Sequence, residues 1–268
     1  MEINSQEIKK SQYNLYFDKS ASINLSLKEL DDELLLVVTN NVCLDINIID
    51  MCMDASLVFF VNNSSTVNVH FVNDFGNKNI TIKANVNDFA SFNFYLADLS
   101  KANLNIESNV ILLGEKAKGS FRFCSVADKG TLKKYNIGFD QIGVGTDTLF
   151  EGYGVSLKDG EIDAKGITHI EQNCTKATAD QRVKIILFDK ESKGKASPIL
   201  KIDCDDIIAN HSCAIGSLNE DHIFYLKTRG LDEEEARKLV TMGYLIPIQS
   251  FFDDSNKEKI NSYIKEIF

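Results

Sequence analysis

Two short stretches, Val67-Asn-Val-His-Phe71 and Ile80-Thr-Ile-Lys-Ala-Asn-Val86, show the pattern that governs most of this chain. In both, apolar residues alternate strictly with polar ones. Alternation with a period of two directs one set of side chains to a buried face and the other to solvent, which is typical of a β-strand. We therefore predict a strand at each stretch, with the apolar set facing a common core.

Short apolar runs of the same kind recur about every 10 to 13 residues between residues 33 and 123. They cover residues 34–38, 44–48, 57–61, 67–71, 80–86, 92–96, 104–106, 110–112 and 121–123. The residues between them are rich in Asn, Asp, Ser and Gly, which favour turns. Less regular strands continue through residues 133–140, 148–157, 166–170 and 182–188. Many short, evenly spaced strands suit a sandwich, a barrel or a β-solenoid, and the spacing alone does not choose among them.

Composition and charge exclude several classes of function. The 268 residues are 44% hydrophobic and 25% charged, with a net charge of −10, as in soluble globular proteins. No apolar run approaches the roughly 18 residues that span a bilayer, and the first residues lack the basic and apolar regions of an export signal. An acidic chain without a basic stripe repels phosphates, so we expect neither nucleic acid nor a membrane as partner. We expect a cytoplasmic protein.

The spacing of the six cysteines matches no metal-binding or redox motif. They are Cys43, Cys52, Cys124, Cys174, Cys204 and Cys213. None forms a C-x-x-C pair, which argues against a zinc ribbon or a thioredoxin-type site. Their dispersed spacing favours reduced thiols that act mostly as small buried hydrophobic side chains.

The sequence also predicts no phosphate loop. The string Gly143-Val-Gly-Thr146 does not open a predicted helix, and no G-x-x-x-x-G-K-[ST] motif occurs. Any ATP hydrolysis linked to this chain must therefore take place in a partner.

The last 52 residues change from strand patterns to helix patterns. Ser217-Leu-Asn-Glu220 reads as a capping box for a helix that Gly230 ends. Asp232-Glu-Glu-Glu235 is predicted to cap a second helix, which stops at Gly243. Ser255-Asn-Lys-Glu258 is predicted to cap a third. The pattern indicates a compact helical subdomain.

These changes of pattern divide the chain into three parts. We expect an N-terminal segment at residues 1–32, a β core at residues 33–216 and the helical subdomain at residues 217–268. The first segment is polar and weakly patterned. We predict a short helix followed by an edge strand there.

The last part of the β core carries the most reactive side chains. Cys204, His211 and Cys213 supply thiol and imidazole groups within ten residues, on predicted elements that can converge. The small neighbours of His211 leave room for another chain or a ligand. Imidazole and thiolate are suitable iron ligands. The alternative is that His211 hydrogen-bonds a backbone carbonyl at a strand end.

The other histidines and an acidic turn are expected to lie on the surface without a specific function. His70 lies in an alternating strand and, like His169 and His222, is expected on a solvent-facing surface. The turn Asp203-Cys-Asp-Asp206 contains carboxylates that suit a hard cation, but a solvated acidic turn is the commoner outcome.

A longer motif gives this region a resemblance to a known family. The motif is His211-Ser-Cys-Ala-Ile-Gly216, then Asp221-His-Ile-Phe-Tyr-Leu-Lys-Thr-Arg-Gly-Leu231, then Glu234-Glu-Ala236. It resembles the C-terminal signature of the SufB/SufD family, the scaffold of the Suf iron–sulfur cluster assembly system. Pro198-Ile-Leu-Lys-Ile202 and Arg182-Val-Lys-Ile-Ile-Leu-Phe-Asp189 fit its last β-helix coils. The resemblance is continuous over about residues 165–244 and architectural before them.

The resemblance implies a mainly β protein, a right-handed parallel β-helix with a small C-terminal α-helical subdomain. In the family, two such subunits pair through their β-helices, and a His of the SufD-type subunit faces a Cys of the SufB-type subunit. His211 matches that histidine and is thereby implied as a transient iron ligand, with Cys213 and Cys204 as further candidates at the cluster-assembly interface. The resemblance implies no catalytic residue and no stably bound cofactor, only a transient iron–sulfur cluster between subunits.

Departures from the family pattern indicate the SufD-like side. Ser212 stands where SufB-type members have a glutamate, and residues 193–197 lack the cysteine that SufB-type members have there. One departure points away from SufD: Ala209 stands where many SufD proteins have a cysteine. By comparison with the family, we expect a short member without most of the usual N-terminal helical region. We expect a non-catalytic, SufD-like scaffold that pairs with a SufB-type subunit or with an identical copy.

The family's helical domain docks on the ABC-type ATPase SufC. The resemblance implies Tyr225, Arg229, Gly230 and Asp232 as docking residues. Alternatively, these residues only pack or end the helices, with Arg229 stabilising a helix C-terminus by its charge. Two other functions remain as alternatives, a carbohydrate-active β-helix protein and a structural β-solenoid that polymerises through its strand edges.

Overall fold

The computed structural model describes residues 2–3, 13–28, 30, 33–51 and 54–267, which form seventeen strands and three helices. The odd sheet contains β1 (Glu2–Ile3), β3 (Ala21–Leu27), β5 (Cys43–Met51), β7 (Thr66–Asn73), β9 (Ser91–Asp98), β11 (Lys118–Ala127), β13 (Asp147–Ser156), β15 (Ala177–Leu187) and β17 (Ile207–Ser217). The even sheet contains β2 (Tyr13–Phe17), β4 (Glu33–Val38), β6 (Ala55–Val61), β8 (Lys78–Val86), β10 (Leu104–Leu112), β12 (Leu132–Gln141), β14 (Glu161–Ile170) and β16 (Lys193–Ile202).

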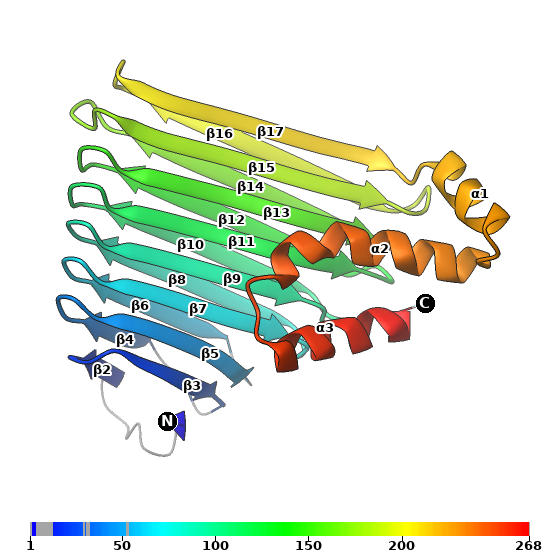
Figure 1. The fold of residues 1–268 in the computed structure, drawn as a ribbon, viewed down its shortest axis with the longest axis horizontal. Coiled ribbons are helices and arrows are strands. Elements are labelled where there is room, and N and C mark those ends of the chain that lie inside the picture. The colour runs from blue at the N-terminus through cyan, green and yellow to red at the C-terminus, as the bar shows by residue number, and fades with distance from the viewer. Residues whose placement is uncertain (1, 4–12, 29, 31–32, 52–53, 268) are drawn as a thin grey trace.

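The two sheets together form a β-solenoid. All the strand pairings are parallel, and the chain passes alternately from one sheet to the other, so that each pair of successive strands adds one coil (Figure 1). Of the three architectures that the sequence left open, parallel pairing excludes the antiparallel sandwich and barrel. The prediction of a mainly β solenoid with C-terminal helices is confirmed.

The hydrophobic core lies between the two sheets. Val69, Phe94, Phe121 and Phe150 are successive register partners across β7, β9, β11 and β13, and each is at most 1% exposed. The rings of Phe94 and Phe121 stack with their centroids 5.2 Å apart. The apolar set of each alternating strand therefore points inward, as predicted.

The alternation locates most strands but not all of their ends. The runs 104–106 and 110–112 belong to the single strand β10, because its inward position between them is the buried polar residue Ser108. His211 lies within the strand β17 and not at its end, because β17 continues to Ser217. The short helix predicted within residues 1–32 is not found among the described residues of that segment, which contribute strands to both sheets. Residues 1, 4–12, 29 and 31–32 lie outside the described residues.

A polar cluster is enclosed within the solenoid. The Lys133 Nζ lies 3.1 Å from the Asp98 Oδ2, and both side chains are fully buried. The ammonium also donates to the backbone oxygen of Ser100 at 2.6 Å, and the Asn73 amide donates to the Asp98 Oδ1 at 2.9 Å. Buried charges need such partners because leaving water is costly. The cluster ties β9 to β12 across the core.

The glycine motif at residues 143–146 forms a corner of the solenoid. A Cβ at Gly143 would lie 1.9 Å from the carbonyl oxygen of Gly114 in the preceding coil, so a larger residue does not fit. Gly145 has a φ of +68°, in the left-handed region that favours glycine. Its N–H donates to the Thr175 oxygen of the next coil at 2.8 Å. The glycines therefore serve the close stacking of coils.

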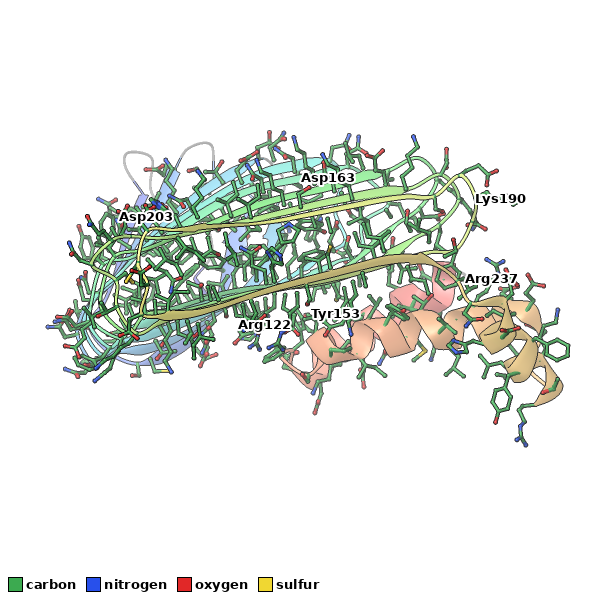
Figure 2. All side chains as sticks on the ribbon, turned by 90° about the horizontal axis from the view of Figure 1, so that it is seen from above. Arg122, Tyr153, Asp163, Lys190, Asp203 and Arg237 are labelled. Atoms are coloured by element: carbon green, nitrogen blue, oxygen red, sulfur yellow. The ribbon has the colours of Figure 1, made fainter. Side chains whose placement is uncertain are left out.

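The helices α1 (Glu220–Thr228), α2 (Glu233–Gln249) and α3 (Asp254–Ile267) form the C-terminal subdomain. The subdomain covers the outer face of the odd sheet, where α2 contacts β9, β11 and β13 (Figures 1 and 2). Arg122 and Tyr153 lie on that face (Figure 2), and the Arg122 guanidinium is 4.3 Å from the centroid of the Phe251 ring. Within the described part of the chain, no helix is long and apolar enough to cross a membrane.

One of the three predicted helix starts is confirmed. Asp232 and Glu235 form both bonds of a capping box, at 2.8 and 2.9 Å. The box predicted at Ser217 is wrong, because Ser217 is still part of β17 and Asn219 caps α1 instead. The third is also wrong, because Asp253 accepts a backbone N–H of the first turn of α3 at 2.7 Å.

One of the two predicted helix ends is confirmed and the other is wrong. Gly230, with a φ of +94°, follows α1 as expected. Gly243 does not end α2, which continues to Gln249. Leu245 and Ile248 are fully buried beyond Gly243, and their burial outweighs the weak helix propensity of glycine.

Candidate functional site

The solenoid has an open end at its last coil. β16 pairs only with β14, and β17 only with β15, so each strand has a free edge among the described residues. These two strands form the upper end of the molecule in Figure 1, where no further strand or helix covers them. Free strand edges present unpaired N–H and C=O groups and readily pair with another chain.

Apolar residues of the core reach this open end and remain exposed. Ile202 on β16 and Ile215 on β17 are register partners of the buried Ile170 and Ile185, so they occupy inward positions. They are nevertheless 43% and 39% exposed. The last coil therefore has an inner surface that lacks its covering layer.

His211 lies on β17 in the middle of this inner surface. It is the register partner of Gln181, which is the partner of Phe150 in the preceding coil. Gln181 and Phe150 are buried, whereas His211 is exposed. No hydrogen bond or ion pair of the His211 ring is found with any described residue, so the alternative bond to a backbone carbonyl receives no support.

The structure brings Cys213, but not Cys204, next to His211. Cys213 is two residues along the same strand, on the same inward face, and is an exposed free thiol. Cys204 is buried in the corner before β17, in a cluster with Cys174 and Ala177. Burial raises the pKa of the Cys174 thiol, which keeps it protonated and a poor ligand.

Gln181 forms the floor beneath His211 and is not among the residues that the sequence marks as functional candidates. Its Nε2 donates to the Thr168 Oγ1 at 2.9 Å and to the Ile199 backbone oxygen at 3.1 Å, which links the two sheets. Its Oε1 is buried and has no hydrogen-bond partner among the described residues. A signal was present, since Gln181 interrupts the alternating apolar residues of β15 at an inward position.

The proposed docking residues lie at the far end of the helical subdomain. Tyr225 is 55% exposed, and the Arg229 guanidinium lies 5.1 Å from its ring centroid. Gly230 and Asp232 have local roles in ending α1 and capping α2. Phe224 was missed although it is 70% exposed. Adjacent aromatic residues point to different sides of a helix, so one of this pair could have been expected to face solvent.

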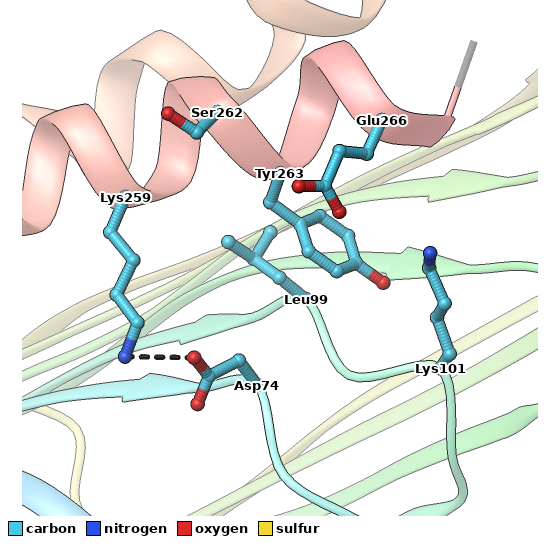
Figure 3. A pocket seen from close by; sticks show the side chains of 7 residues that line it. All are labelled: Asp74, Leu99, Lys101, Lys259, Ser262, Tyr263 and Glu266. Atoms are coloured by element: carbon cyan, nitrogen blue, oxygen red, sulfur yellow. Dashed lines mark ion pairs between the residues drawn. The ribbon is translucent and has the colours of Figure 1, made fainter.

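A cavity of about 530 Å³ lies between α3 and two corners of the solenoid (Figure 3). Asp74, Lys101, Tyr263 and Glu266 line it, and the Lys259 ammonium lies 2.9 Å from the Asp74 carboxylate. Burial, followed by the nearby carboxylates, raises the pKa of Tyr263. Lysines and carboxylates balance in number, so the cavity has no net charge to select an ionic ligand.

Comparison with protein-family models gives one match. Residues 44–244 match the family described as "SUF system FeS cluster assembly, SufBD core domain". The match begins well before residue 165, where the sequence analysis set the start of continuous resemblance, and ends at the same residue. It includes the open end, His211, α1 and the first part of α2.

Curated proteins are similar to part of this chain at low identity. The chain is 28% identical over 142 residues to "Iron-sulfur cluster assembly protein SufD" of Bacillus subtilis, which covers 53% of this chain and 32% of that protein. It is 27% identical over 157 residues to an "Iron-sulfur cluster assembly SufBD family protein" of Staphylococcus epidermidis, which covers 59% of this chain and 34% of that protein. The chain thus spans about a third of the length of these relatives. Because the family model covers most of the chain, the protein belongs to the SufBD core family of the SUF iron–sulfur cluster assembly system.

Proposed function

We propose that this chain is a SufD-like scaffold subunit that pairs through its open end with a SufB-type subunit or with an identical copy. The observation that carries the proposal is the position of His211, an inward residue of the last coil without a covering layer. Pairing of a second solenoid with β16 and β17 would satisfy their free edges and bury Ile202 and Ile215. Burial of apolar surface contributes about 25 cal/mol per Å².

Pairing would enclose His211 and Cys213 at the seam between subunits. Imidazole and thiolate are ligands that iron accepts, and the small inward neighbour Ala209 leaves space beside His211. Iron and sulfide are the cargo, and the assembled cluster is released to other proteins. No resident cofactor and no catalytic residue of this chain is needed for that role.

We also propose that the helical subdomain docks on a SufC-type ABC ATPase. The exposed side chains of Phe224 and Tyr225 on α1 and of Leu239 on α2 support this, since they are 70%, 55% and 49% exposed. ATP hydrolysis then belongs to the partner. Large apolar side chains exposed together are typical of interaction surfaces.

The chain offers a direct link between the docking surface and His211. β17 ends at Ser217, Leu218 is buried, and Asn219 caps α1. A force that moves α1 therefore acts through a very short connection on the strand that carries His211. In this mechanism the ATPase pulls on α1, the seam between subunits changes shape, and His211 and Cys213 become accessible to iron and sulfide.

The location that fits this role is the cytoplasm. All five described cysteines, namely Cys43, Cys124, Cys174, Cys204 and Cys213, are free thiols. Reduced thiols are usual in the cytosol. The family match favours the scaffold over both the carbohydrate-active protein and the polymerising solenoid.

Co-purification tests the proposal. The chain is expected to form a complex at micromolar concentration with a SufC-type ATPase and with a SufB-type subunit, or to dimerise with itself. Ile215→Asp is expected to abolish pairing but keep ATPase binding. The control is Phe89→Asp, which removes an apolar side chain that is 52% exposed at a corner of a middle coil. The proposal fails if the wild-type chain forms neither complex, or if both variants pair normally.

A further inference from the structure

A second group of ligating side chains lies on the outer face of the even sheet, near the corner before β17. The His169 Nε2 is 2.8 Å from the Asp203 Oδ2, and its Nδ1 is 3.5 Å from the Glu171 Oε1 and 3.9 Å from the Asp140 Oδ1. One imidazole is thus surrounded by three carboxylates. A protonated histidine needs only one carboxylate to balance its charge, so the other two exceed what an ion pair requires.

We propose that His169, Glu171 and Asp203 bind a divalent transition-metal ion of the manganese-to-zinc series. One ligand atom from each of the three residues lies within 4.8 Å of the others. Two ligands of one ion at about 2.0–2.2 Å are at most about 4.4 Å apart, so small side-chain rotations bring all three to the ion. One imidazole nitrogen with carboxylate oxygens suits ions of this series.

The backbone holds these residues in place. Asp140 and His169 are register partners on β12 and β14, so their side chains share the outer face. The Glu171 N–H donates to the Gln141 oxygen at 3.0 Å, and the Asp203 N–H donates to the Ile170 oxygen at 2.9 Å. Successive coils therefore fix the positions from which the ligands extend, and a preformed ligand set binds with less ordering cost.

The third carboxylate, that of Asp140, gives the imidazole a second partner. Histidines that bind metals usually donate their other ring N–H to a carboxylate, which fixes the tautomer and the ring orientation. For Nε2 to bind the ion together with Asp203 and Glu171, the Glu171 side chain turns away from the Nδ1, 3.5 Å from which it now lies. Asp140, at 3.9 Å, is then the carboxylate beside the Nδ1. Asp140 thus supplies the supporting contact that such a site requires.

The site is open to solvent and opposed by one neighbouring cation. The His169 and Asp203 side chains are 28% and 60% exposed, and Asp203 lies at the end of the solenoid remote from Arg237 (Figure 2). Lys201 is the register partner of His169 on β16, so its ammonium weakens the field at the ion. An exposed site of this kind exchanges its ion readily. The site needs neither a partner subunit nor nucleotide, and its test is independent of the proposed function.

Titration with Mn²⁺, followed by the electron paramagnetic resonance of the unbound ion, tests the proposal. Mn²⁺ favours oxygen and imidazole over thiols, so the cysteines contribute little. The parent protein carries His211→Ala and Cys213→Ser, which removes the ligands at the open end. We expect saturable binding of one ion per chain, and a loss of affinity of about tenfold or more in His169→Ala and in Asp203→Asn.

Three further variants distinguish a site from general attraction to acidic groups. Asp205→Asn removes a carboxylate from the same corner, and His222→Ala removes an exposed imidazole on α1; neither is expected to change the affinity. Lys201→Gln is expected to raise it several-fold. Circular dichroism confirms that each variant is folded. The proposal is overturned if His169→Ala binds Mn²⁺ as tightly as its parent, or if Asp205→Asn loses as much affinity as Asp203→Asn.

Discussion

Phe121 in a middle coil and His211 in the last coil occupy the same inner column of the odd sheet. The column runs from Val69 through Phe94, Phe121 and Phe150 to Gln181 and His211. Phe121 has a coil on each side and is 1% exposed. His211 has a coil on one side only and is exposed. Backbone position and strand direction are the same, so the difference comes from the missing neighbour.

This contrast distinguishes the residues that stabilise the solenoid from the residues that are available for function. In the middle coils, inward residues gain their stability from neighbours above and below. At the open end the column changes to Gln181 and then His211, which suit hydrogen bonding and metal ligation rather than packing. Stability and function are therefore divided along one axis of the molecule, and substitutions can test this division.

The largest expected loss of stability comes from Phe121→Ala. The Phe121 ring contacts Phe94 and Phe150, with centroid distances of 5.2 and 6.4 Å. Aromatic rings on both sides cannot collapse into the space, so we expect a loss near the upper end of about 3–5 kcal/mol. Urea unfolding followed by circular dichroism measures it. Ile215→Ala at the open end is the control and should cost about 1 kcal/mol or less; equal losses would contradict the contrast.

Asp98→Asn is expected to cause the second-largest loss of unfolding free energy, about 3 kcal/mol. It leaves the fully buried Lys133 ammonium without a carboxylate, although the Ser100 oxygens still accept from it. The matched change is Asp163→Asn, whose partner Lys195 on β16 is 65% exposed at 3.5 Å. Exposed pairs contribute about 0–1 kcal/mol. A similar shift of the urea midpoint in both variants would show that the interior is more hydrated than the structure indicates.

The sequence predicted the strands of the middle coils but not the open end, and the reason is physical. Alternation reports which side of a strand is inward, and the inward positions of β17 are in register with those of β15. It does not report whether another coil follows. Phe121, Phe150, Gln181 and His211 recur about every 30 residues, which is the length of one coil.

The same reasoning explains how the group around His169 escaped notice. His169 was expected on a solvent-facing surface and Asp203 in a solvated acidic turn. Both do lie at the surface, but one coil of chain separates them in sequence and the structure places them 2.8 Å apart. Aligning the sequence at the coil length would have put Asp140 next to His169. Only the path of the corner brings Asp203 to them.

Gln181→Ala tests the transition between the two regions. The substitution removes the bonds to Thr168 and Ile199 and leaves the Ile199 oxygen without this donor. Loss of one partner of buried hydrogen bonds costs about 1–3 kcal/mol, so the urea midpoint should fall less than in Asp98→Asn. Gln181→Glu adds a charge at the same buried position and should cost more than Gln181→Ala. An unchanged midpoint in both would mean that the floor beneath His211 is not structural.

The smallest effect on stability and the most specific effect on function are expected from His211→Ala. An exposed side chain without hydrogen bonds contributes little to folding, so the change in unfolding free energy should stay within about 0.5 kcal/mol. If His211 lies at the seam as we propose, the variant should still bind its partners but lower the activity of cluster-dependent enzymes in cells that rely on this chain. The control is His222→Ala, which removes another exposed imidazole from α1 and should leave that activity intact. A folded His211→Ala variant with wild-type activity would mean that the exposed histidine has no part in cluster assembly. A large loss of stability would mean that His211 contributes to folding as Phe121 does, which would contradict the contrast between the two coils.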